Sequence, residues 1–588
     1  MVAAVLVVPL SMGLPARASN PAIVVNSTVD PGNGTCDVTQ CTLREAIAKA
    51  NADAGADEID FAIPGAGVHA ITPVVPLPTI SEQLTIDGFT QGGPENTSHL
   101  VELLGSSAGD NADGLDVEAA DSIVKGFSIG EFHGYGIVAL ADGIEVAGNQ
   151  IGIAPDGSAT GNLGSGVLVQ NAADVVVGGT SAADRNVISN NGGHGVWVTS
   201  PLSHDNTVEG NFIGTDLAGT GAAGNVQNGV FVDDAAGTTI GGTAAGAGNV
   251  ISANGTGDVF DDGIHGVALT GQDVSGSVVQ GNFIGTDVTG TLALGNHGNG
   301  VFTTGGAHDT TIGGAAAGAG NLLSGNDEGI VLFSPAGTVI QGNRIGTTAD
   351  GKHALPNRVG IGVEGSDVTI GGTADGAGNV ISGNTARGID LQSNRAVIQG
   401  NLIGTTADGL HALGNGTTGV YVGGAESVVI GGSVPGAGNV IAASGDDGIN
   451  LTGDRARILG NSIGTDRSGA RSLGNGANGI ELAGTLAKVG GTSAASGNLI
   501  KHNGGTGVVV VSGDLNLVRH DLITANGGLA IDLGGDGVTP NDAGDGDTGA
   551  NDLVNFPVVR SAVHRSATKT DLGLSLRAAP NQRFALDV

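Results

Sequence analysis

Short runs of β-branched residues recur along most of the chain, and glycine, asparagine and aspartate separate them. A glycine followed by Ile, Val or Leu opens such a run at Gly114, Gly136, Gly166, Gly195, Gly229, Gly266, Gly300, Gly329, Gly360, Gly388, Gly419, Gly448, Gly479, Gly507 and Gly528. The intervals between them range from 21 to 37 residues. This regular spacing predicts a repeat protein built from short strands.

Two kinds of repeat unit alternate, as in residues 388–418 and 419–447. Each contains three β-branched runs with turn-forming residues between them, and the runs are too short and too rich in glycine for helical repeats. A propeller blade fits poorly, because it needs about 40 residues and four strands. We therefore predict an all-β protein, a single-stranded parallel β-helix of about 15 coils over residues 65–555.

Asparagines mark the length of a coil. Asn343, Asn379, Asn401, Asn439 and Asn461 follow one another at intervals of 36, 22, 38 and 22 residues. The basic coil is thus 22 residues, with insertions alternately after IGT and after IGG. We expect these asparagines to form an internal ladder of amide hydrogen bonds, because stacked amides pair from one layer to the next. Further members are Asn149, Asn186, Asn211, Asn249, Asn282, Asn321 and Asn498.

The N-terminal region, residues 19–64, has a different pattern. The segment CTLREAIAKANADAG predicts one helix, with Thr42 and Glu45 as a capping box and Gly55 as its stop. Strands are expected at 23–25 and 59–63. The helix, over residues 42–54, would close one end of the β-helix, which otherwise exposes apolar core and unpaired strand edges.

The hexapeptide Cys41 to Ala46, together with residues 77–93 and 529–559, resembles the bacterial CSLREA-domain family. The hexapeptide has Thr where the family name has Ser. The resemblance implies a secreted or surface-anchored right-handed parallel β-helix of the pectin-lyase-like superfamily. It implies no catalytic residues.

Charge and apolar content limit the partners and the compartment. The chain has 22 basic and 57 acidic residues, which give a formal net charge of −35, and this negative charge excludes a nucleic-acid binder.

Residues 1–18 resemble a signal peptide, with an apolar run and an A-x-A sequence ending at Ala18, but they lack a basic start. Either the true start lies upstream or the segment is a frayed terminus. No later apolar run is long enough to span a membrane. We expect a secreted or cell-surface protein, a monomer.

The two cysteines, Cys36 and Cys41, close a small loop. In an exported chain a disulfide is expected between them. A two-ligand metal clip and two free thiols are the alternatives.

Two groups of acidic residues are candidates for calcium. Near the C-terminus an oxygen-rich cluster contains Asp536, Asn541, Asp542, Asp545, Asp547 and Asp552, and it does not match an EF-hand loop. A second group, Asp156, Asp216, Asp287, Asp350, Asp408 and Asp466, follows successive IGT sequences. We favour turn formation for the second group, since Asp-Gly sequences are ordinary turns.

Strand alternation predicts which residues point away from the core. One outward position per coil is apolar in the first half of the rod and polar in the second. Trp197, Phe231 and Phe302 belong to the first half and predict a stripe that stacks on sugar rings or docks another surface. The alternative is that a loop covers it, notably the insertion at 251–265.

Catalytic patterns are weak. Asp261, Asp262 and His194 have the residue types of a polygalacturonase-like site, but in the wrong order. Four arginines occur near Asp350 and Asp390, namely Arg344, Arg358, Arg387 and Arg395. A polysaccharide lyase needs such a base beside carboxylate-bound calcium. Outward strand positions explain these charges equally well. No catalytic residue is assigned.

The sequence therefore predicts a non-catalytic extracellular rod for adhesion, surface display or glycan contact. The alternative is a polysaccharide lyase or glycoside hydrolase acting on an acidic polysaccharide. Residues 556–588 are expected to begin a further β domain, which the chain leaves truncated.

Overall fold

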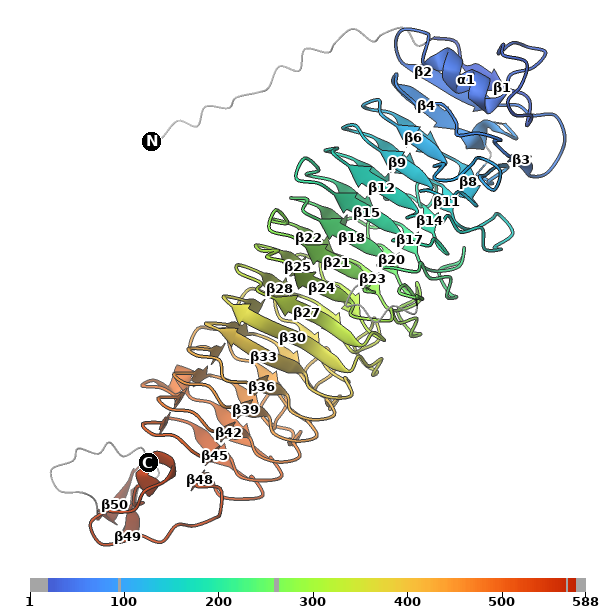
Figure 1. Ribbon diagram of the computed structural model, residues 1–588. Coiled ribbons are helices and arrows are strands. Elements are labelled where there is room, and N and C mark those ends of the chain that lie inside the picture. The colour runs from blue at the N-terminus through green and yellow to red at the C-terminus, as the bar shows by residue number, and fades with distance from the viewer. Residues whose placement is uncertain (1–19, 94–96, 258–263, 567–568, 578–588) are drawn as a thin grey trace, which may run out of the picture.

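The computed structural model describes residues 20–93, 97–257, 264–566 and 569–577. The signal-like residues 1–18 lie outside this part. In it the chain winds into a rod of stacked coils, with helix α1 (Leu43–Ala50) at one end and strands β49 (Val558–Ser566) and β50 (Lys569–Ser575) at the other (Figure 1).

Three long parallel sheets, here named A, B and C, run the length of the rod. Sheet A has 17 strands: β1 (Ile23–Val25), β2 (Asp57–Phe61), β4 (Leu84–Asp87), β7 (Ile123–Lys125), β10 (Glu145–Ala147), β13 (Val176–Gly178), β16 (Thr207–Glu209), β19 (Thr239–Gly241), β22 (Val278–Gln280), β25 (Thr311–Gly313), β28 (Val339–Gln341), β31 (Thr369–Gly371), β34 (Val397–Gln399), β37 (Val429–Gly431), β40 (Arg457–Leu459), β43 (Lys488–Gly490) and β46 (Leu517–Arg519).

Sheet B has 16 strands, most of them only two residues long: β3 (His69–Ile71), β5 (Val101–Leu104), β8 (Phe127–Gly130), β11 (Gln150–Ile151), β14 (Val187–Ile188), β17 (Phe212–Ile213), β20 (Val250–Ile251), β23 (Phe283–Ile284), β26 (Leu322–Leu323), β29 (Arg344–Ile345), β32 (Val380–Ile381), β35 (Leu402–Ile403), β38 (Val440–Ile441), β41 (Ser462–Ile463), β44 (Leu499–Lys501) and β47 (Leu522–Thr524).

Sheet C has 15 strands: β6 (Leu115–Val117), β9 (Ile137–Ala139), β12 (Val167–Gln170), β15 (Val196–Thr199), β18 (Val230–Asp233), β21 (Val267–Thr270), β24 (Val301–Thr304), β27 (Glu328–Phe333), β30 (Val359–Ser366), β33 (Ile389–Asn394), β36 (Val420–Val422), β39 (Ile449–Leu451), β42 (Ile480–Leu482), β45 (Val508–Val510) and β48 (Ile531–Leu533). Short 3-10 helices lie at η1 (Gly88–Thr90), η2 (Ala494–Ser496) and η3 (Ala550–Leu553).

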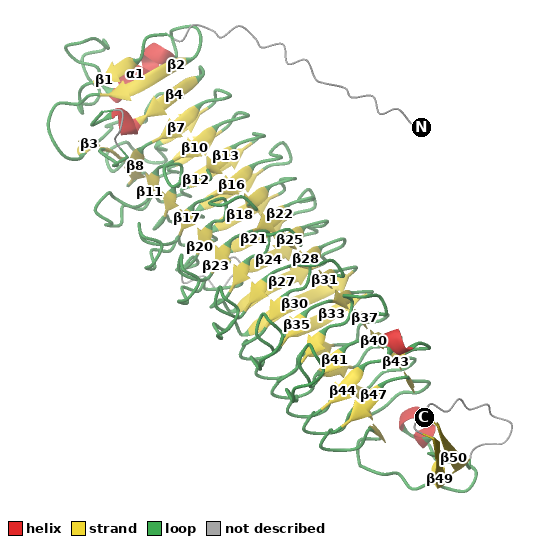
Figure 2. Cartoon of the chain, turned by 180° about the vertical axis from the view of Figure 1, so that it is seen from behind, coloured by secondary structure: helices red, strands yellow, loops and turns green. Residues whose placement is uncertain are grey.

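Each strand of sheets A, B and C pairs in parallel with the equivalent strand one coil on, which confirms the predicted parallel β-helix (Figure 2). The fifteen glycine-marked runs correspond to the strands of sheet C, although the last of them, β48, begins at Ile531, later than the run after Gly528 predicts. Ile361, Ile389 and Val420 stack in register and are fully or almost fully buried. Stacks of this kind form the apolar core and account for the β-branched repeat.

The asparagine ladder is present. The side-chain amide of each member donates to the side-chain oxygen of the next at 2.9 to 3.2 Å, from Asn149 through Asn343, Asn379, Asn401, Asn439 and Asn461 to Asn498. At its end Asn498 donates to Asp521 at 2.8 Å. Because every amide of this ladder finds a partner, the ladder satisfies buried polar groups whose desolvation would otherwise cost free energy.

A second ladder escaped the sequence analysis. It lies at the corner before sheet C and is interrupted at Ser444. The signal was available, since these asparagines regularly precede a strand of sheet C, as Asn191 precedes Val196. Its members are Asn162, Asn191, Asn225, Asn254, Asn296, Asn326, Asn357, Asn384, Asn415, Asn475, Asn503 and Asn526.

Helix α1 begins as predicted, with the reciprocal capping box of Thr42 and Glu45. The predicted extent to residue 54 was wrong, because the helix ends at Ala50. The Asn51 side chain donates to the carbonyl of Thr79 at 2.7 Å and accepts from the N–H of Ser81 at 2.9 Å, which diverts the chain at that point.

The rest of the CTLREA hexapeptide also has structural partners. Arg44 pairs with Asp30 at 2.8 Å and donates to the carbonyls of Val75 and Pro76 at 2.7 and 2.6 Å. A disulfide joins Cys36 to Cys41, as expected, and neither cysteine is free. These contacts fasten the loop around α1 to the first coil.

Candidate functional site

The outward residues of sheet C form one continuous column, called here the outer column. It comprises Asp116, Val138, Leu168, Trp197, Phe231, Ala268, Phe302, Val331, Gly362, Asp390, Tyr421, Asn450, Glu481, Val509 and Asp532. A flanking row of residues, each preceding the glycine that opens the strand, lies beside it. Aromatic, charged and amide side chains all occur in the column and the flanking row, whereas the buried positions of the rod repeat from coil to coil.

The aromatic segment of the column centres on Trp197 and Phe231. Their rings are stacked, with centroids 6.2 Å apart, and both side chains are partly exposed. His194 of the flanking row lies 4.6 Å from the ring of Phe231 and 5.6 Å from that of Trp197, and Tyr135 lies 6.4 Å from Trp197. Four rings therefore gather at this place, tilted against one another by 25° to 59°.

His194 is held neutral within this segment. Burial lowers its pKa to about 4, and its Nδ1 accepts from the backbone N–H of Asn228 at 3.2 Å. The Asn228 side-chain oxygen in turn accepts from the N–H of His265 at 2.6 Å. The imidazole is thus an uncharged ring at neutral pH, held by its hydrogen bond to the next coil.

The prediction that Phe302 is exposed was wrong. Its side chain is 8% exposed, with His265 stacked on it at 4.2 Å and Phe333 edge-on at 5.8 Å. Ala268 separates it from Phe231, so the aromatic stripe is discontinuous. Residues 258–263, part of the insertion considered as an alternative cover for the stripe, lie outside the described residues, and Asp261 and Asp262 are among them.

A charged segment lies around Gly362, two coils past Phe302. Arg358 pairs with Asp327 at 2.9 Å and with Glu328, whose carboxylate lies over Gly362. A Cβ at position 362 would come within 2.9 Å of Glu328 Oε2, so the carboxylate needs the glycine. Burial raises the pKa of Glu328, and the charge of Arg358 opposes that rise.

Asp390 is the neighbour of Gly362 on the next strand. Arg387 pairs with its Oδ2 at 2.5 Å and lies over the Tyr421 ring, 3.8 Å from the centroid. Oδ1 of Asp390 is buried and has no hydrogen-bond partner among the described residues. The structure thus brings together three of the residues considered for catalysis, Arg358, Arg387 and Asp390, and adds Glu328 and Tyr421.

The other residues considered with them lie apart. Arg344 is on sheet B, Arg395 pairs with Asp367 at 2.5 Å, and Asp350 accepts from Thr348 and Lys352 within its own turn. These residues are close in sequence but lie apart in the fold, because consecutive corners of one coil face different sides of the rod.

Carboxylates also occur at the first position of the column, Asp116, and near Asn450 in its second half. Burial, and then the charge of Asp113, raises the pKa of Asp116 to about 6. Further along, the Asn450 amide bridges Asp447 at 3.0 Å and Glu481 at 3.1 Å. Burial is the main cause that raises the pKa of both carboxylates.

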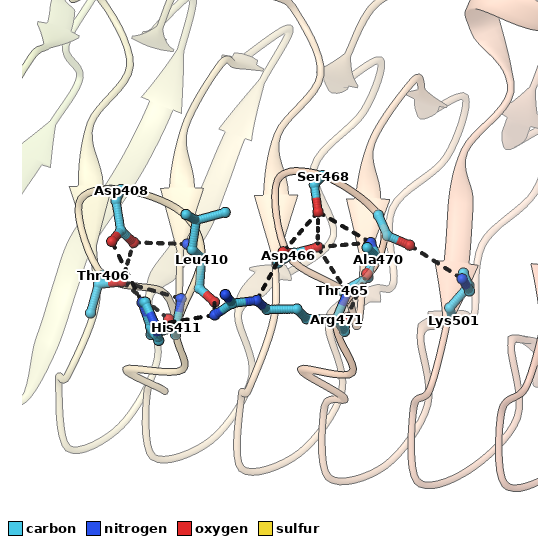
Figure 3. A network of polar contacts seen from close by, with 11 residues as sticks. Thr406, Asp408, Leu410, His411, Thr465, Asp466, Ser468, Ala470, Arg471 and Lys501 are labelled. Carbon is cyan, nitrogen blue, oxygen red and sulfur yellow. Dashed lines mark hydrogen bonds and ion pairs between the residues drawn. The ribbon is translucent and has the colours of Figure 1, made fainter.

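The aspartates after IGT belong to turns (Figure 3). Asp408 accepts from the Thr406 hydroxyl at 2.6 Å and the Leu410 N–H at 2.9 Å, and these bonds lower its pKa. Asp466 accepts similarly from Ala470 and Arg471, at 2.9 and 3.1 Å. They follow β35 and β41, which are two coils apart in sheet B, so these two aspartates do not lie on successive coils.

The C-terminal acidic cluster forms a loop bonded to itself. Asp542 accepts from Gly546 at 3.0 Å and from Asn555, Asp545 accepts from the Asn555 N–H at 2.7 Å, and Asn541 pairs with Phe556. Within the described ranges, no group of three or more His, Cys, Asp or Glu side chains is arranged to hold a metal ion. The same ranges contain no helix long and apolar enough to cross a membrane.

Sequence analysis missed His265 and Glu328, which directly precede the glycine that opens a strand. His194 and Arg387 occupy the same position in their coils. Both were considered, but only as part of catalytic patterns. The role of His194 as a stacked ring depends on the neighbouring coils, which are far apart in sequence.

No family model matches the chain. It is 26% identical over 374 residues to the adhesin BmaC autotransporter of Brucella suis biovar 1 (strain 1330), which covers 58% of this chain and 10% of that protein. The chain therefore spans about a tenth of the length of this curated relative.

Two solved structures illustrate the structural similarities. The A-module of the Azotobacter vinelandii mannuronan C-5 epimerase AlgE4 matches with a TM-score of 0.30 and 15% identity, over 85% of this chain and 96% of that one. PfbA, a surface adhesin of Streptococcus pneumoniae, matches with a TM-score of 0.25 and 11% identity, over 92% and 95%. These values carry no argument about activity.

Proposed function

We propose that this protein is an extracellular or cell-surface rod that binds a glycan along its outer column. The observation that supports the proposal most is the stacked pair Trp197 and Phe231, with His194 against both rings. Flat, partly exposed aromatic rings offer apolar faces to sugar rings, and burial of such faces is favourable. The relative named as an adhesin, similar over 58% of this chain, supports a surface location.

The proposal changes the predicted binding residues. Trp197 and Phe231 make the contact, whereas Phe302 supports His265 from below. A CSLREA-type cap, a signal segment and a monomeric state belong to the proposal as further predictions. Fractionation of the producing cells tests the location.

Retention on a glycan array tests the contact. We expect Trp197→Ala to weaken binding by about tenfold or more, since an aromatic contact contributes about 1 kcal/mol beyond the area that it buries. Phe556→Ala is the matched control, because Phe556 is also an exposed aromatic residue (47%) but lies near the C-terminus. Equal loss in both variants, or none in Trp197→Ala, would contradict the proposal.

A second candidate function, an enzyme acting on polysaccharide, is favoured by one observation: the carboxylates Glu328 and Asp390 lie on either side of Gly362, with two arginines beside them. Glycan binding does not depend on this second function.

Calcium at the C-terminal cluster, Asp536 to Asp552, remains a proposal supported by its oxygen content. A ligand that binds only the folded state raises its stability with concentration. Melting with calcium and with EDTA tests this, and identical curves would remove calcium from the account.

A further inference from the structure

We propose that β48, the last strand of sheet C, binds an extended peptide segment of another protein, which adds to the sheet as one further strand. The segment has an apolar, a basic and an apolar residue in succession. The inference goes beyond the glycan contact proposed above and does not rest on it, because it concerns the C-terminal end of the rod.

One edge of β48 is unpaired. β48 lies at the end of the rod near β49 and β50 (Figure 1), and among the described strands it pairs with β45 alone. On that side the N–H of Val508 donates to the carbonyl of Ala530 at 2.9 Å. Bonding directions alternate along a strand, so the N–H and C=O groups of Ile531 and Leu533 face the free edge. A row of such groups is a template for another strand.

A cleft lies at this edge. All three residues of β48 line it, and its volume of about 450 Å³ is within the range of ligand pockets. Ile531 is 43% exposed, whereas Val508, its neighbour in the stack, is fully buried. The cleft therefore offers the apolar residues of an added strand the kind of burial that inner coils give to theirs. Its apolar lining comprises Ile531, Leu533, Val538, Leu553, Val554 and Phe556.

A second wall of the cleft, residues 553–557, is anchored to the rest of the chain. Just before it, the Asn551 side chain donates to the carbonyl of Asn516 at 2.8 Å and accepts from the N–H of Asn516 at 2.7 Å. Within it, the N–H of Asn555 donates to Asp545 at 2.7 Å. A peptide that enters a preformed cleft does not have to order its wall, which reduces the entropic cost of binding.

Asp532 indicates a basic residue at the middle position. It lines the cleft, and it is only 7% exposed. Its Oδ2 accepts from the N–H of Gly537 at 3.2 Å, whereas Oδ1 is buried and has no hydrogen-bond partner among the described residues. Residues in register on neighbouring strands lie side by side, as Val509 and Asp532 do. A lysine in register with Asp532 therefore brings a positive charge to this carboxylate, and opposite charges at such positions attract.

The test measures binding of a fluorescein-labelled peptide to the whole chain by fluorescence anisotropy. The peptide is Ser-Gly-Ile-Lys-Leu-Thr, which copies the pattern of Gly448 to Leu451 with Lys at the outward position. A peptide with Glu in place of Lys should bind about tenfold more weakly, because its carboxylate meets Asp532. Methylation of the Lys and Thr backbone nitrogens keeps every side chain but removes the two donors that face β48, and should also weaken binding about tenfold.

Two variants of the chain locate the site. Asp532→Asn should weaken binding of the Lys peptide about tenfold and remove its advantage over the Glu peptide. Asp367→Asn, which removes an exposed carboxylate paired with Arg395, is the matched control and should bind as the wild type does. Phe556→Ala should weaken binding about tenfold, because it removes a ring from the lining. Phe556 is 47% exposed, so the melting temperature should stay close to that of the wild type.

Weaker binding in both Asp532→Asn and Phe556→Ala would support the inference. Absent binding, or equal binding of the Lys and Glu peptides, would overturn it. Equal binding of the methylated peptide would exclude strand addition and overturn it as well. Sedimentation of the chain alone tests a second copy, since a dimer that the peptide dissociates would assign the edge to self-association instead. Binding that appears only in Phe584→Ala would assign the cleft to the chain's own last residues, and either result would overturn the inference.

Discussion

The aromatic and charged segments of the outer column share one backbone and differ in nearly all of their surface chemistry. Strands β15, β18 and β24 carry Trp197, Phe231 and Phe302, whereas β33, β36 and β42 carry Asp390, Tyr421 and Glu481. All six belong to sheet C, and the same buried ladder runs behind them. In this fold the inward positions are therefore fixed by the core, and the outward positions are free to acquire function.

The two segments also differ in how their side chains contribute to stability. The aromatic rings bury one another, and Phe302 and His194 are 8% and 9% exposed. The charged segment relies on ion pairs with exposed members, such as Arg358 with 53% of its side chain exposed, and exposed pairs contribute about 0–1 kcal/mol.

The largest expected effect comes from truncating a ring in each segment. Phe302→Ala should cost about 3 kcal/mol locally, because it removes a buried ring from beneath His265. Tyr421→Ala should cost less than about 1 kcal/mol, since it removes a partly exposed ring under Arg387. Hydrogen exchange of β24 and β36 measures the two effects separately. Equal effects would mean that the two segments are packed alike.

Much of the fold follows from sequence because each coil repeats the same local demands. The glycines that open strands, the β-branched inward residues and the asparagines from Asn343 to Asn461 recur once in every coil, so the strands of sheet C and the ladder could be predicted. Departures from the pattern arise from single long-range contacts. Asn51 shortens α1 by bonding to Thr79 and Ser81, which no local rule indicates.

The candidate site was less predictable for the same reason. Alternation alone placed Trp197 and Phe231 on the outside correctly, but it treated every outward residue as exposed. Phe302 is buried by His265, which lies one coil away and 37 residues earlier in the chain. Glu328 was missed because its importance depends on Gly362, a residue without a side chain.

A second, smaller effect is the pH response of the aromatic segment. His194 has a pKa of about 4 in the folded chain, below its ordinary value of about 6.5. As the pH falls from 6.5 toward 4 the unfolded chain binds a proton that the folded chain does not, so stability is lost over that range, by about 2 kcal/mol. His194→Gln should flatten this dependence. Fluorescence of Trp197, the single tryptophan of the chain, reports on this segment, and an equally steep dependence in the variant would contradict the assignment.

The smallest expected effect has the opposite sign and belongs to a carboxylate of the same column. The pKa of Asp116 is raised to about 6, from an ordinary value of 3.8. The folded chain therefore holds a proton more tightly than the unfolded chain, and the resulting stability, present below about pH 3.8, is lost as the pH rises through 6.

Asp116→Asn should remove that loss and stabilise the first coils by about 1 kcal/mol above pH 6, because an amide keeps a donor toward Asp113 without adding charge. Hydrogen exchange of β6 at pH 5 and pH 7, corrected for the intrinsic rates, measures the difference. Between pH 4 and pH 6 the coil at Asp116 and the coil at His194 should then respond in opposite directions. Parallel responses would show that the column titrates as one unit and that the contrast between its aromatic and carboxylate positions has no energetic basis.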